Sequence, residues 1–390
     1  MSTSAPRMLV SYTTAGAGHR RAAEAMAQAL ARLIPDADIV CHDALKCTPL
    51  WWRWSYPRTY YYLVRATAWL WALAFRCLDH PIGYAIWQPI RRQGNLIMAW
   101  RWLRELQQHP PQLIVVTHFF PCDVISTAKR AGWLRAPLVV VVTDFHPHAF
   151  WLSREAEAYI CSTEQGARTL VARGIPADRI HVLGIPIDRR FAEIRDREAI
   201  RRQVGLSGGR RTILITSGGA TVGPFEAVVR ALTALERCWP GRIQLLVVCG
   251  ENTKTAARLR AAARQTSMPV KVFEFVETMP ELMAASDLIV AKAGGLTVTE
   301  AMAAGLPMLM YHVIPGQEQA NARALINAGA AVLIRDPKRV AETVRRLCED
   351  PGRMAALRQA AQRLSHPHAA DDIVEQVIKP LLQSPMTKFQ

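Results

Sequence analysis

Short β-branched runs alternate with Ala-rich amphipathic segments along most of this chain, and that alternation constrains its fold most. In the first half, strands are expected over residues 8–12, 37–41, 113–117, 138–143, 159–161 and 180–183. Helices are expected over 19–33 and over 163–173, the second opened by a capping box of Ser162 and Gln165. Strands that alternate with helices predict βαβ units and a parallel sheet covered on both faces.

A second series of the same kind follows a charged, glycine-containing stretch at residues 191–211, which we interpret as a linker. Its expected strands are residues 212–216, 243–249, 270–273, 287–290, 307–310 and 331–334. We therefore predict an α/β protein with two Rossmann-like domains facing across a cleft. Residues 1–190 form the first domain, residues 212–383 the second, and residues 384–390 a loose tail.

The chain is strongly basic, with 48 basic and 32 acidic residues and a formal net charge of +16. Such a charge favours nucleic acid, anionic lipid or a phosphorylated substrate as partner. Hydrophobic residues make up 50% of the chain, which excludes a mainly disordered protein. Its eight cysteines include no CxxC pair and are interpreted as free thiols in a reducing compartment.

The charge is densest between residues 45 and 110, which hold nine basic and two acidic residues. The same window contains eight of the eleven Trp and five of the eight Tyr, a composition found nowhere else in the chain. Its most apolar part, residues 60–78, is interrupted by Arg65 and Arg76 and is not expected to span a membrane. The N-terminus shows no signal-peptide pattern, so we expect a cytoplasmic chain.

Glycine-containing loops follow several expected strands, where a doubly wound fold binds its ligands. In TTAGAGH, at residues 13–19, Gly16 and Gly18 let the backbone approach a ligand. His19 would lie on the first turn of the next helix, where an imidazole can take a proton from a hydroxyl; capping or packing is the alternative. The loop lacks the third glycine of a GxGxxG fingerprint, so a dinucleotide site is not favoured.

Two glycine-rich loops in the second domain suit a diphosphate. They are TSGGA, with Gly218 and Gly219, and KAGGLT, with Gly294 and Gly295.

Polar side chains accompany these two loops. Thr297 and Glu300 match a T-x-x-E capping box; alternatively, Glu300 accepts both hydroxyls of a ribose. The loop PGQEQAN presents Gln317, Glu318 and Asn321, whose amides and carboxylate suit either the hydroxyls of a sugar or a solvated helix start.

Two acidic motifs suggest metal chemistry only weakly. Asp36-Ala37-Asp38 matches a DxD motif, but it precedes an N-terminal strand and is interpreted as chance. Asp144, His146 and His148 follow a strong strand in TDFHPHAFW. A metal site is possible there, but a carboxylate and two imidazoles in a substrate loop are the preferred interpretation.

Taken together, the loops resemble one enzyme family. GGLTVTEAMAAGLP followed by PGQEQAN is similar to the donor-binding region of monogalactosyldiacylglycerol synthases and processive diacylglycerol glucosyltransferases. The transferase that forms lipid II is a more distant relative. AGAGH, VTDF and GIPID match the lipid-modifying branch, so the resemblance spans nearly the whole chain. Plant galactosyl enzymes have a proline inside the phosphate loop, which here is GGLT, and this difference leaves glucose and galactose open.

The resemblance implies a GT-B fold, a UDP-sugar donor in the C-terminal domain and an inverting transfer without an obligatory metal. It places Phe275 and Val276 beside the uracil; Gly294, Gly295 and Thr297 at the diphosphate; and Glu300 at the ribose. It places Gln317 and Glu318 at the sugar. It makes His19 the base that deprotonates the acceptor, with Asp144 as a candidate helper and His146 on the acceptor side.

The aromatic and basic window falls where this family places its acceptor- and membrane-facing insertion. Trp51, Trp52, Trp54, Tyr56 and Tyr60 to Tyr62 suit a lipid interface, although half of these aromatics would otherwise fill the core. Amphipathic segments would lie in the interface without spanning it. The arginines expected to face anionic lipid are Arg53, Arg58, Arg65, Arg76, Arg91, Arg92, Arg101 and Arg104.

The sequence therefore predicts a transferase that moves glucose or galactose from UDP to diacylglycerol or a related lipid. We expect it to be peripheral, on the cytoplasmic side of the cell membrane, and to need no cofactor. A UDP-sugar 2-epimerase is one alternative, although an epimerase does not need the aromatic window. A membrane- or nucleic-acid-binding protein with a degenerate donor site is another, which the intact donor motifs argue against. Nucleic acid is not favoured, because no binding module is recognised.

Overall fold

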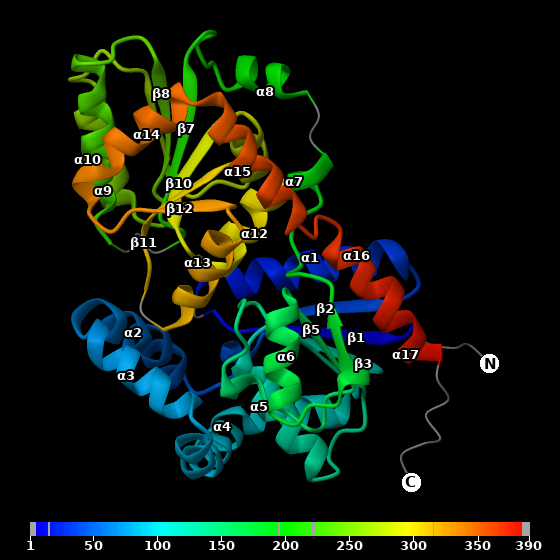
Figure 1. The fold of residues 1–390 in the computed structure, drawn as a ribbon. Helices are drawn as coiled ribbons and strands as arrows, with labels where there is room; N and C mark the ends of the chain where they lie inside the picture. The colour runs from blue at the N-terminus through cyan, green and yellow to red at the C-terminus, as the bar shows by residue number, and fades with distance from the viewer. Residues whose placement is uncertain (1–4, 15, 194–195, 220–222, 315, 384–390) are drawn as a thin grey trace. The chain divides into compact units, whose positions relative to one another are not determined.

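The computed structural model describes residues 5–14, 16–193, 196–219, 223–314 and 316–383, which fall into two compact units (Figure 1). Unit 1 consists of residues 1–188 and 368–390, and unit 2 of residues 189–367. Within the described residues, each unit contains one six-stranded sheet in which every pairing is parallel. This confirms the expected α/β class.

The sheet of unit 1 has the strand order β2-β1-β3-β4-β5-β6. Its strands are β1 (Arg7–Tyr12), β2 (Asp38–Asp43), β3 (Leu113–Val116), β4 (Leu138–Val141), β5 (Ala158–Cys161) and β6 (Ile180–Val182). The chain order reverses between β1 and β3, and at such a switch point the loops after the strands diverge and leave room for a ligand.

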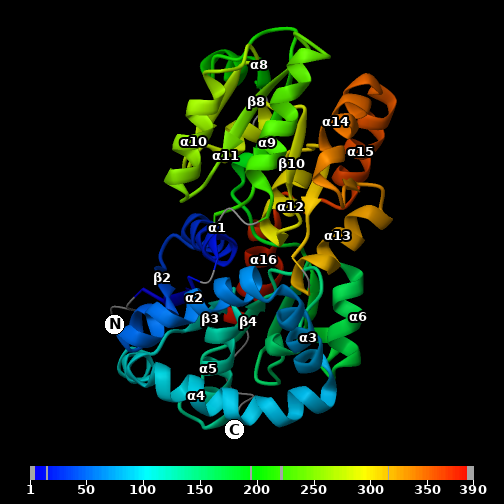
Figure 2. The same ribbon diagram turned by 90° about the vertical axis from the view of Figure 1, so that its left-hand side faces the viewer.

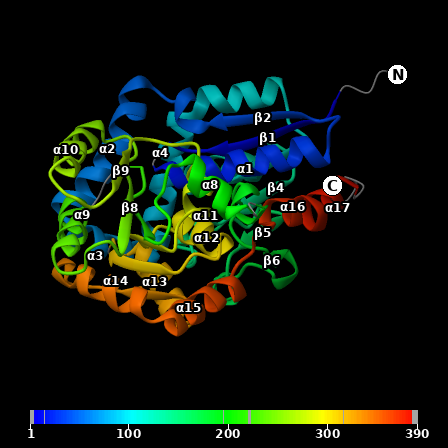
Figure 3. The same ribbon diagram turned by 90° about the horizontal axis from the view of Figure 1, so that it is seen from above.

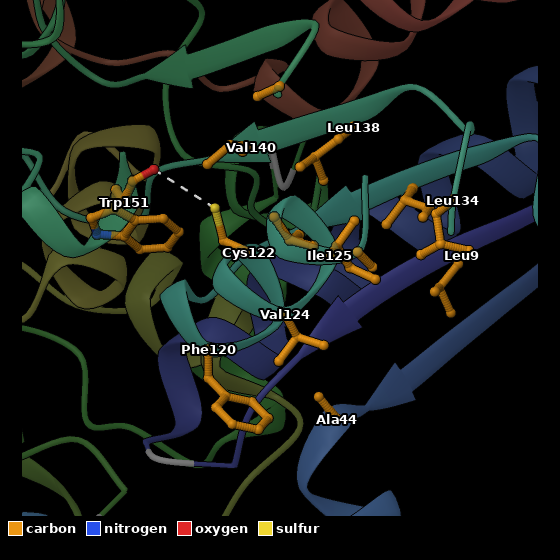
Figure 4. Close-up of a cluster of buried hydrophobic side chains, with 14 of the residues drawn as sticks. Leu9, Ala44, Phe120, Cys122, Val124, Ile125, Leu134, Leu138, Val140 and Trp151 are labelled. Carbon is orange, nitrogen blue, oxygen red and sulfur yellow. Dashed lines mark hydrogen bonds between the residues drawn. The ribbon is translucent and has the colours of Figure 1, made fainter. Parts of the chain in front are cut away.

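The central strands β3, β4 and β5 are buried on both faces because their residues are apolar without alternation. Met8 and Val10 of β1 point to one face, where α1 (Ala17–Leu33) covers them. Leu9 points to the other face, where it joins the cluster around Phe120 and Trp151 (Figure 4). That second cluster includes α5 (Phe119–Arg130) and the inner side of α4 (Pro81–Gln108).

Three consecutive α-helices connect β2 to β3, where amphipathic segments were expected (Figure 2). They are α2 (Leu50–Ala66), α3 (Ala68–Asp79) and α4, which together contain the aromatic and basic window. Further along the chain, α6 (Glu164–Ala172) begins one residue later than expected. Its N-cap is Thr163, whose hydroxyl accepts from the Gly166 N–H at 3.0 Å, so the predicted Ser162 capping box is wrong.

Unit 2 has the strand order β12-β11-β10-β7-β8-β9, with its own buried core. Its strands are β7 (Arg211–Thr216), β8 (Ile243–Val248), β9 (Val270–Phe273), β10 (Leu288–Lys292), β11 (Met308–His312) and β12 (Ala331–Leu333). Its helices are α7 (Arg190–Glu193), α8 (Arg197–Gln203), α9 (Phe225–Thr233), α10 (Thr253–Ala263), α11 (Met279–Ala284), α12 (Gly295–Ala303), α13 (Gln317–Asn327), α14 (Val340–Glu349) and α15 (Pro351–Arg363).

The expected domain boundaries need two corrections. The segment 191–211 contains most of α7 and all of α8, and it belongs to unit 2. Residues 368–383 were assigned to the second domain, but the chain returns there to unit 1 as α16 (Ala369–Ile373), a π-helical turn (Val374–Ile378) and α17 (Lys379–Gln383). Figures 1 and 3 show α16 beside α1. Ile373 and Val377 are buried against Met26 and Leu30 of α1, and this apolar contact explains the return.

Candidate active site

The loop after β1 places His19 on the first turn of α1. Gly16 caps this helix at φ 125°, a backbone conformation that residues with a side chain rarely adopt. The hydroxyl of Thr14 donates to Asp43 Oδ2 over 2.6 Å, and its N–H donates to Asp43 Oδ1 over 3.3 Å. This anchor ties the loop to the end of β2, and α1 then begins at Ala17, with Gly18 and His19 in its first turn.

The ring of His19 is held by two threonines from neighbouring strand ends. Its Nδ1 lies 2.9 Å from the carbonyl oxygen of Thr117 and 2.8 Å from the hydroxyl oxygen of Thr143. A carbonyl oxygen only accepts, so Nδ1 must carry the proton of the neutral ring. The lone pair therefore sits on Nε2, which makes that nitrogen the proton-accepting atom.

Burial keeps this imidazole neutral. It lowers the pKa of His19 from 6.5 to about 4, and the hydrogen bond to Thr117 opposes the shift. His118 lies edge-on to His19, with ring centroids 4.5 Å apart. Burial, together with the charges of His19 and Arg91, lowers the pKa of His118 well below its usual range. At neutral pH both rings are uncharged, as a general base must be before it accepts a proton.

The loop after β4 brings Asp144 to the same strand ends. Asp144 is buried and directly follows Thr143, which contacts His19. His148 instead faces α3, and its Nε2 donates to the carbonyl of Phe75 over 2.9 Å. Asp144 is therefore next in sequence to a residue that contacts His19, whereas His148 is engaged in a structural contact.

Asp79, the last residue of α3, holds this loop in place. Its carboxylate accepts from the N–H of Ala149 and from Arg173 Nη2, both at 2.8 Å, and it lies 3.5 Å from Nε2 of His146. Burial raises the pKa of Asp79, but the hydrogen bonds from His146 and Arg173 outweigh it and hold the pKa below its usual range. The predicted acceptor residue His146 is therefore tied to α3.

In unit 2, the loops after β7 and β10 converge on the side chain of Lys292. A Cβ added at Gly218, where φ is +72°, would lie 3.3 Å from its Cε. A Cβ added at Gly294 would lie 3.3 Å from its Nζ. Gly219 accepts through its carbonyl from the Glu251 N–H at 3.2 Å, which fastens the first of these loops to the end of β8. The two predicted glycine loops do come together.

The predicted sugar-binding loop joins them from the start of α13. Glu318 is buried and forms an ion pair with Lys292, while its Oε2 accepts from the Ile314 N–H at 3.1 Å. Asn321 is also buried, and its amide donates to the carbonyl of Ala293 over 2.9 Å. Glu318 and Asn321 therefore both contact the segment Lys292–Ala293 at the end of β10 and help to fix the glycine loop that follows it.

The predicted capping box at Thr297 is wrong. The helix α12 begins at Gly295 with Gly294 as its N-cap, so Thr297 is already inside the helix. Glu300 is buried in the same helix. Its role at a ribose stays a prediction, but the alternative role as a capping side chain is excluded.

Four more predicted residues have a less defined place. Phe275 and Val276 follow β9, and the Phe275 side chain is 44% exposed. Arg65 and Gln317 lie in α2 and α13, but their side chains fall outside the described residues.

The outer side of α2, α3 and α4 is unusually apolar. Of seventeen large hydrophobic side chains that are exposed among the described residues, thirteen lie between Leu50 and Trp100, including Trp51, Trp54 and Trp69. Arginines interleave with them, and the guanidinium carbon of Arg58 lies 3.6 Å from the ring centroid of Trp54. An apolar face mixed with cations is typical of an interfacial surface. We call it the α2–α4 face.

Four of the residues that were assigned to the lipid interface face inward instead. Trp52 and Tyr56 pack against the core of unit 1, as the core alternative predicted. Arg91 and Arg92 both pair with the buried carboxylate of Asp123, at 3.2 and 3.3 Å, so their assignment to anionic lipid is wrong.

The described residues contain neither a metal-binding cluster nor a membrane-spanning helix. No cluster of three or more His, Cys, Asp or Glu side chains is placed to hold a metal ion. No helix is both long enough and apolar enough to cross a bilayer. Metal independence itself stays a prediction.

Sequence reasoning missed Lys292, Thr143, Asp79 and Arg173. Lys292 had a signal: it is the one charged residue of the strand sequence LIVAK, at the carboxyl end where ligands bind. The other three are recognised only by contacts between distant parts of the chain.

Sequence models of two known families match this chain. The model of monogalactosyldiacylglycerol (MGDG) synthase matches residues 19–187. The model of the glycosyltransferase family 28 C-terminal domain matches residues 212–376. The two matches cover both units and include His19 and the donor-type loops.

A curated relative and two solved structures agree with these matches. Processive diacylglycerol beta-glucosyltransferase of Bacillus cytotoxicus is 31% identical over 274 residues, or 70% of this chain and 69% of the relative. MurG of Acinetobacter baumannii has a TM-score of 0.61 at 18% identity, covering 96% of this chain and 99% of that one. A putative UDP-N-acetylglucosamine 2-epimerase from Listeria monocytogenes has a TM-score of 0.61 at 15% identity, covering 98% of both chains. The structural likeness confirms the GT-B fold, which hosts both reactions and does not choose between them.

Proposed function

The chain belongs to the family of monogalactosyldiacylglycerol synthases and processive diacylglycerol glucosyltransferases, within glycosyltransferase family 28, and from that membership we propose that it transfers a hexose from a UDP-sugar to diacylglycerol. The transfer is inverting: the acceptor hydroxyl attacks the anomeric carbon from the side opposite UDP. The enzyme must align the hydroxyl, take its proton and stabilise the departing diphosphate.

The observation that carries the proposal is the state of His19. Its Nδ1 donates to a carbonyl and its pKa is about 4, so Nε2 is a free proton acceptor at neutral pH. In the proposed reaction, Nε2 takes the proton of the lipid hydroxyl as the new C–O bond forms. Asp144, buried beside Thr143, is the candidate that stabilises the charged ring once it is protonated.

UDP-glucose is the donor we propose first, because the curated relatives are named glucosyltransferases. Gly218, Gly294 and Gly295 take the diphosphate. Glu300 takes the ribose, and Glu318 takes the sugar. The glycines suit this role because backbone N–H groups can approach the phosphate oxygens closely. We propose that these groups act without a divalent metal.

The acceptor is a membrane lipid, so we propose that the α2–α4 face binds the surface of an anionic bilayer. Exposed tryptophans suit the headgroup region, and each arginine near a charged surface contributes about 1 kcal/mol. The enzyme would then work as a peripheral protein on the cytoplasmic side.

One assay separates the proposal from its alternatives. Purified protein is incubated with labelled UDP-glucose or UDP-galactose and vesicles that contain diacylglycerol, and the organic phase is counted. Label in the lipid supports the transferase. An epimerised soluble nucleotide sugar supports the epimerase alternative, and neither product supports a binding protein with a degenerate donor site.

His19→Ala tests the assigned base within the same assay. The variant loses the proton acceptor, so transfer should fall at least about 10²-fold while UDP binding in the other unit is unchanged. Calorimetry with UDP is the control for an intact donor site. Full activity of His19→Ala would exclude His19 as the base.

A further inference from the structure

Lys292 stands where a cation is most useful to the proposed reaction, and the family-based assignments of donor residues gave it no role. It is the last residue of β10, a strand that is otherwise buried and apolar. Its neighbours in the sheet are β7 and β11, and it pairs with His312 at a register irregularity. The strand therefore delivers one ammonium group to the carboxyl edge of the sheet.

Three separate loops surround this ammonium. The added-Cβ distances of 3.3 Å at Gly218 and at Gly294 show that the backbones of both glycine loops pass close to the lysine side chain. A Cβ at Gly294 would also lie 3.6 Å from Oε1 of Glu318. A side chain at either glycine would take the space beside the ammonium, so the glycines keep it open to a ligand.

Glu318 compensates the lysine within unit 2. Its side chain is 6% exposed and that of Lys292 is 19% exposed, so the carboxylate is the more deeply fixed partner. The carboxylate is also held by the N–H of Ile314. The Lys292 ammonium has three N–H donors. Among the described residues, it makes one hydrogen bond, to Glu318. The ammonium can keep that bond and still donate to a ligand.

The reaction creates negative charge at one atom. As the acceptor oxygen bonds to the anomeric carbon, the bond from that carbon to the β-phosphate oxygen breaks, and its electron pair stays on the oxygen of UDP. The acceptor proton goes to His19. A fixed cation beside the diphosphate stabilises the developing charge more than it stabilises the intact donor, and this difference accelerates transfer.

We propose that Lys292 binds the donor diphosphate and stabilises the charge on departing UDP, with Glu318 holding its ammonium in position. The inference rests on the proposed function for the identity of the donor. It assigns to a side chain part of the work that a divalent cation does in metal-dependent transferases. Glu318 is then shared: one oxygen stays near the ammonium while the carboxylate meets the sugar.

The test compares UDP with uridine, which lacks the phosphates. Lys292→Met removes the charge at nearly constant length. It should weaken UDP binding about 10- to 100-fold, since a hydrogen bond to a charged group is lost. Uridine binding should be unchanged. In the transfer assay, kcat should fall about 10²- to 10³-fold, the usual loss when one preorganised charge-stabilising donor is removed.

Lys338→Met is the matched control, because Lys338 is an exposed lysine of unit 2 outside the donor loops. It should match the wild type in every measurement. Lys292→Met leaves Glu318 buried without its cation, so the double variant Lys292→Met, Glu318→Gln is prepared as well. It removes both charges, and it should bind uridine normally while still losing UDP affinity.

The inference would be overturned if Lys292→Met or the double variant is folded and binds UDP as tightly as the wild type. A rise in KM with kcat unchanged would also overturn it, because that pattern means equal binding of ground and transition states. The failure of this inference differs from failure of the proposed function. The binding of UDP and uridine is measured without lipid. If the wild type transfers no hexose, the proposed function fails, but the effect of Lys292→Met on UDP binding can still be measured.

Discussion

At the scale of single residues, the proposed proton transfer depends on one ring, His19, whose tautomer is set by its neighbours. Thr117 and Thr143 both contact Nδ1 of His19, and they come from the ends of two adjacent strands. Because the carbonyl of Thr117 cannot donate, the ring can accept a proton only at Nε2. If His19 is the base, as we propose, its ring has the required tautomer before any substrate binds.

The first prediction concerns pH. A base works when it is unprotonated, and burial lowers the pKa of His19 to about 4. The kcat/KM profile should therefore rise with pH through about 4 and be flat from about 5 to 7, where an ordinary histidine would still be titrating near 6.5. An acid limb near 6.5 would contradict a buried neutral ring.

The second prediction concerns Thr143. Thr143→Val keeps the shape but removes the hydroxyl at 2.8 Å from Nδ1. One lost hydrogen bond of about 1 kcal/mol should lower kcat about 5-fold with KM unchanged, since Thr143 is not expected to touch the donor. Thr143→Ser restores the hydroxyl and should restore most of kcat. Equal rates for Val and Ser would mean that the hydroxyl does not position the ring.

At the scale of elements, α2, α3 and α4 divide their residues between two environments. Trp102 and Leu103 of α4 are buried, and the Arg91 and Arg92 ion pairs anchor the same helix to α5. Trp69 of α3 is 72% exposed and Leu73 is 53% exposed. Asp79 is the last residue of α3 and accepts hydrogen bonds from the Ala149 N–H and from Arg173. The helix that carries the exposed Trp69 is therefore also bonded to the loop that follows Thr143.

The third prediction tests the α2–α4 face. Trp69→Ser combined with Leu73→Ser removes two exposed apolar side chains, and burying each in a bilayer contributes about 1.5–3 kcal/mol. Binding to anionic vesicles in a sedimentation assay should fall at least about 10-fold. Trp133→Ser is the matched control, because Trp133 is 51% exposed but lies outside these helices. If both variants bind like the wild type, the face does not contact lipid.

The fourth prediction concerns the contacts of Asp79, at the end of α3, with Arg173 and with the loop after β4. Asp79→Asn removes the charge that pairs with Arg173 at 2.8 Å, so the guanidinium is left partly buried beside a neutral group. The unfolding free energy of unit 1 should fall by about 1–3 kcal/mol, measured by urea denaturation. Asp36→Asn, at an exposed carboxylate, should leave it unchanged. Equal unfolding free energies for the two variants would show that the ion pair between Asp79 and Arg173 does not stabilise unit 1.

At the scale of the whole molecule, unit 2 is an insertion in unit 1. The chain leaves unit 1 after Asp188 and returns at His368 to cover α1. Ten of the eleven tryptophans lie in unit 1 and one, Trp239, in unit 2, so tryptophan emission follows the unfolding of unit 1.

The fifth prediction uses that property. Ile373→Ala empties a fully buried position between α16 and α1, which should cost unit 1 about 2–5 kcal/mol. The transition seen by tryptophan emission should move to lower denaturant. Ile326→Ala, at a 40% exposed position in α13, is the matched control and should not move it. An unchanged emission midpoint for Ile373→Ala would place the C-terminal segment outside the unit 1 core.

The strands of both sheets could be predicted from sequence because each is a short apolar run, and neighbours such as β3 and β4 are buried on both faces. His19 and the glycine loops could be predicted because they follow such strands. The contacts of His19 with Thr117 and Thr143 could not, since they join parts of the chain about a hundred residues apart. The return of residues 368–383 was missed for a similar reason, because an amphipathic helix does not indicate which core its apolar side covers.

Because unit 2 is inserted in the sequence of unit 1, the two units can complete their folding only in a fixed order during synthesis. Residues 189–367 can complete their own core as soon as they leave the ribosome, since that core draws on no later segment. The core of unit 1 is completed later, because Ile373 and Val377 are synthesised after the whole of unit 2. Until then the nascent chain exposes apolar residues of α1 and of the sheet face beside it, and exposed apolar surface of this kind is prone to aggregate. Residues 370–378 therefore complete the core of unit 1 only after unit 2 has been synthesised.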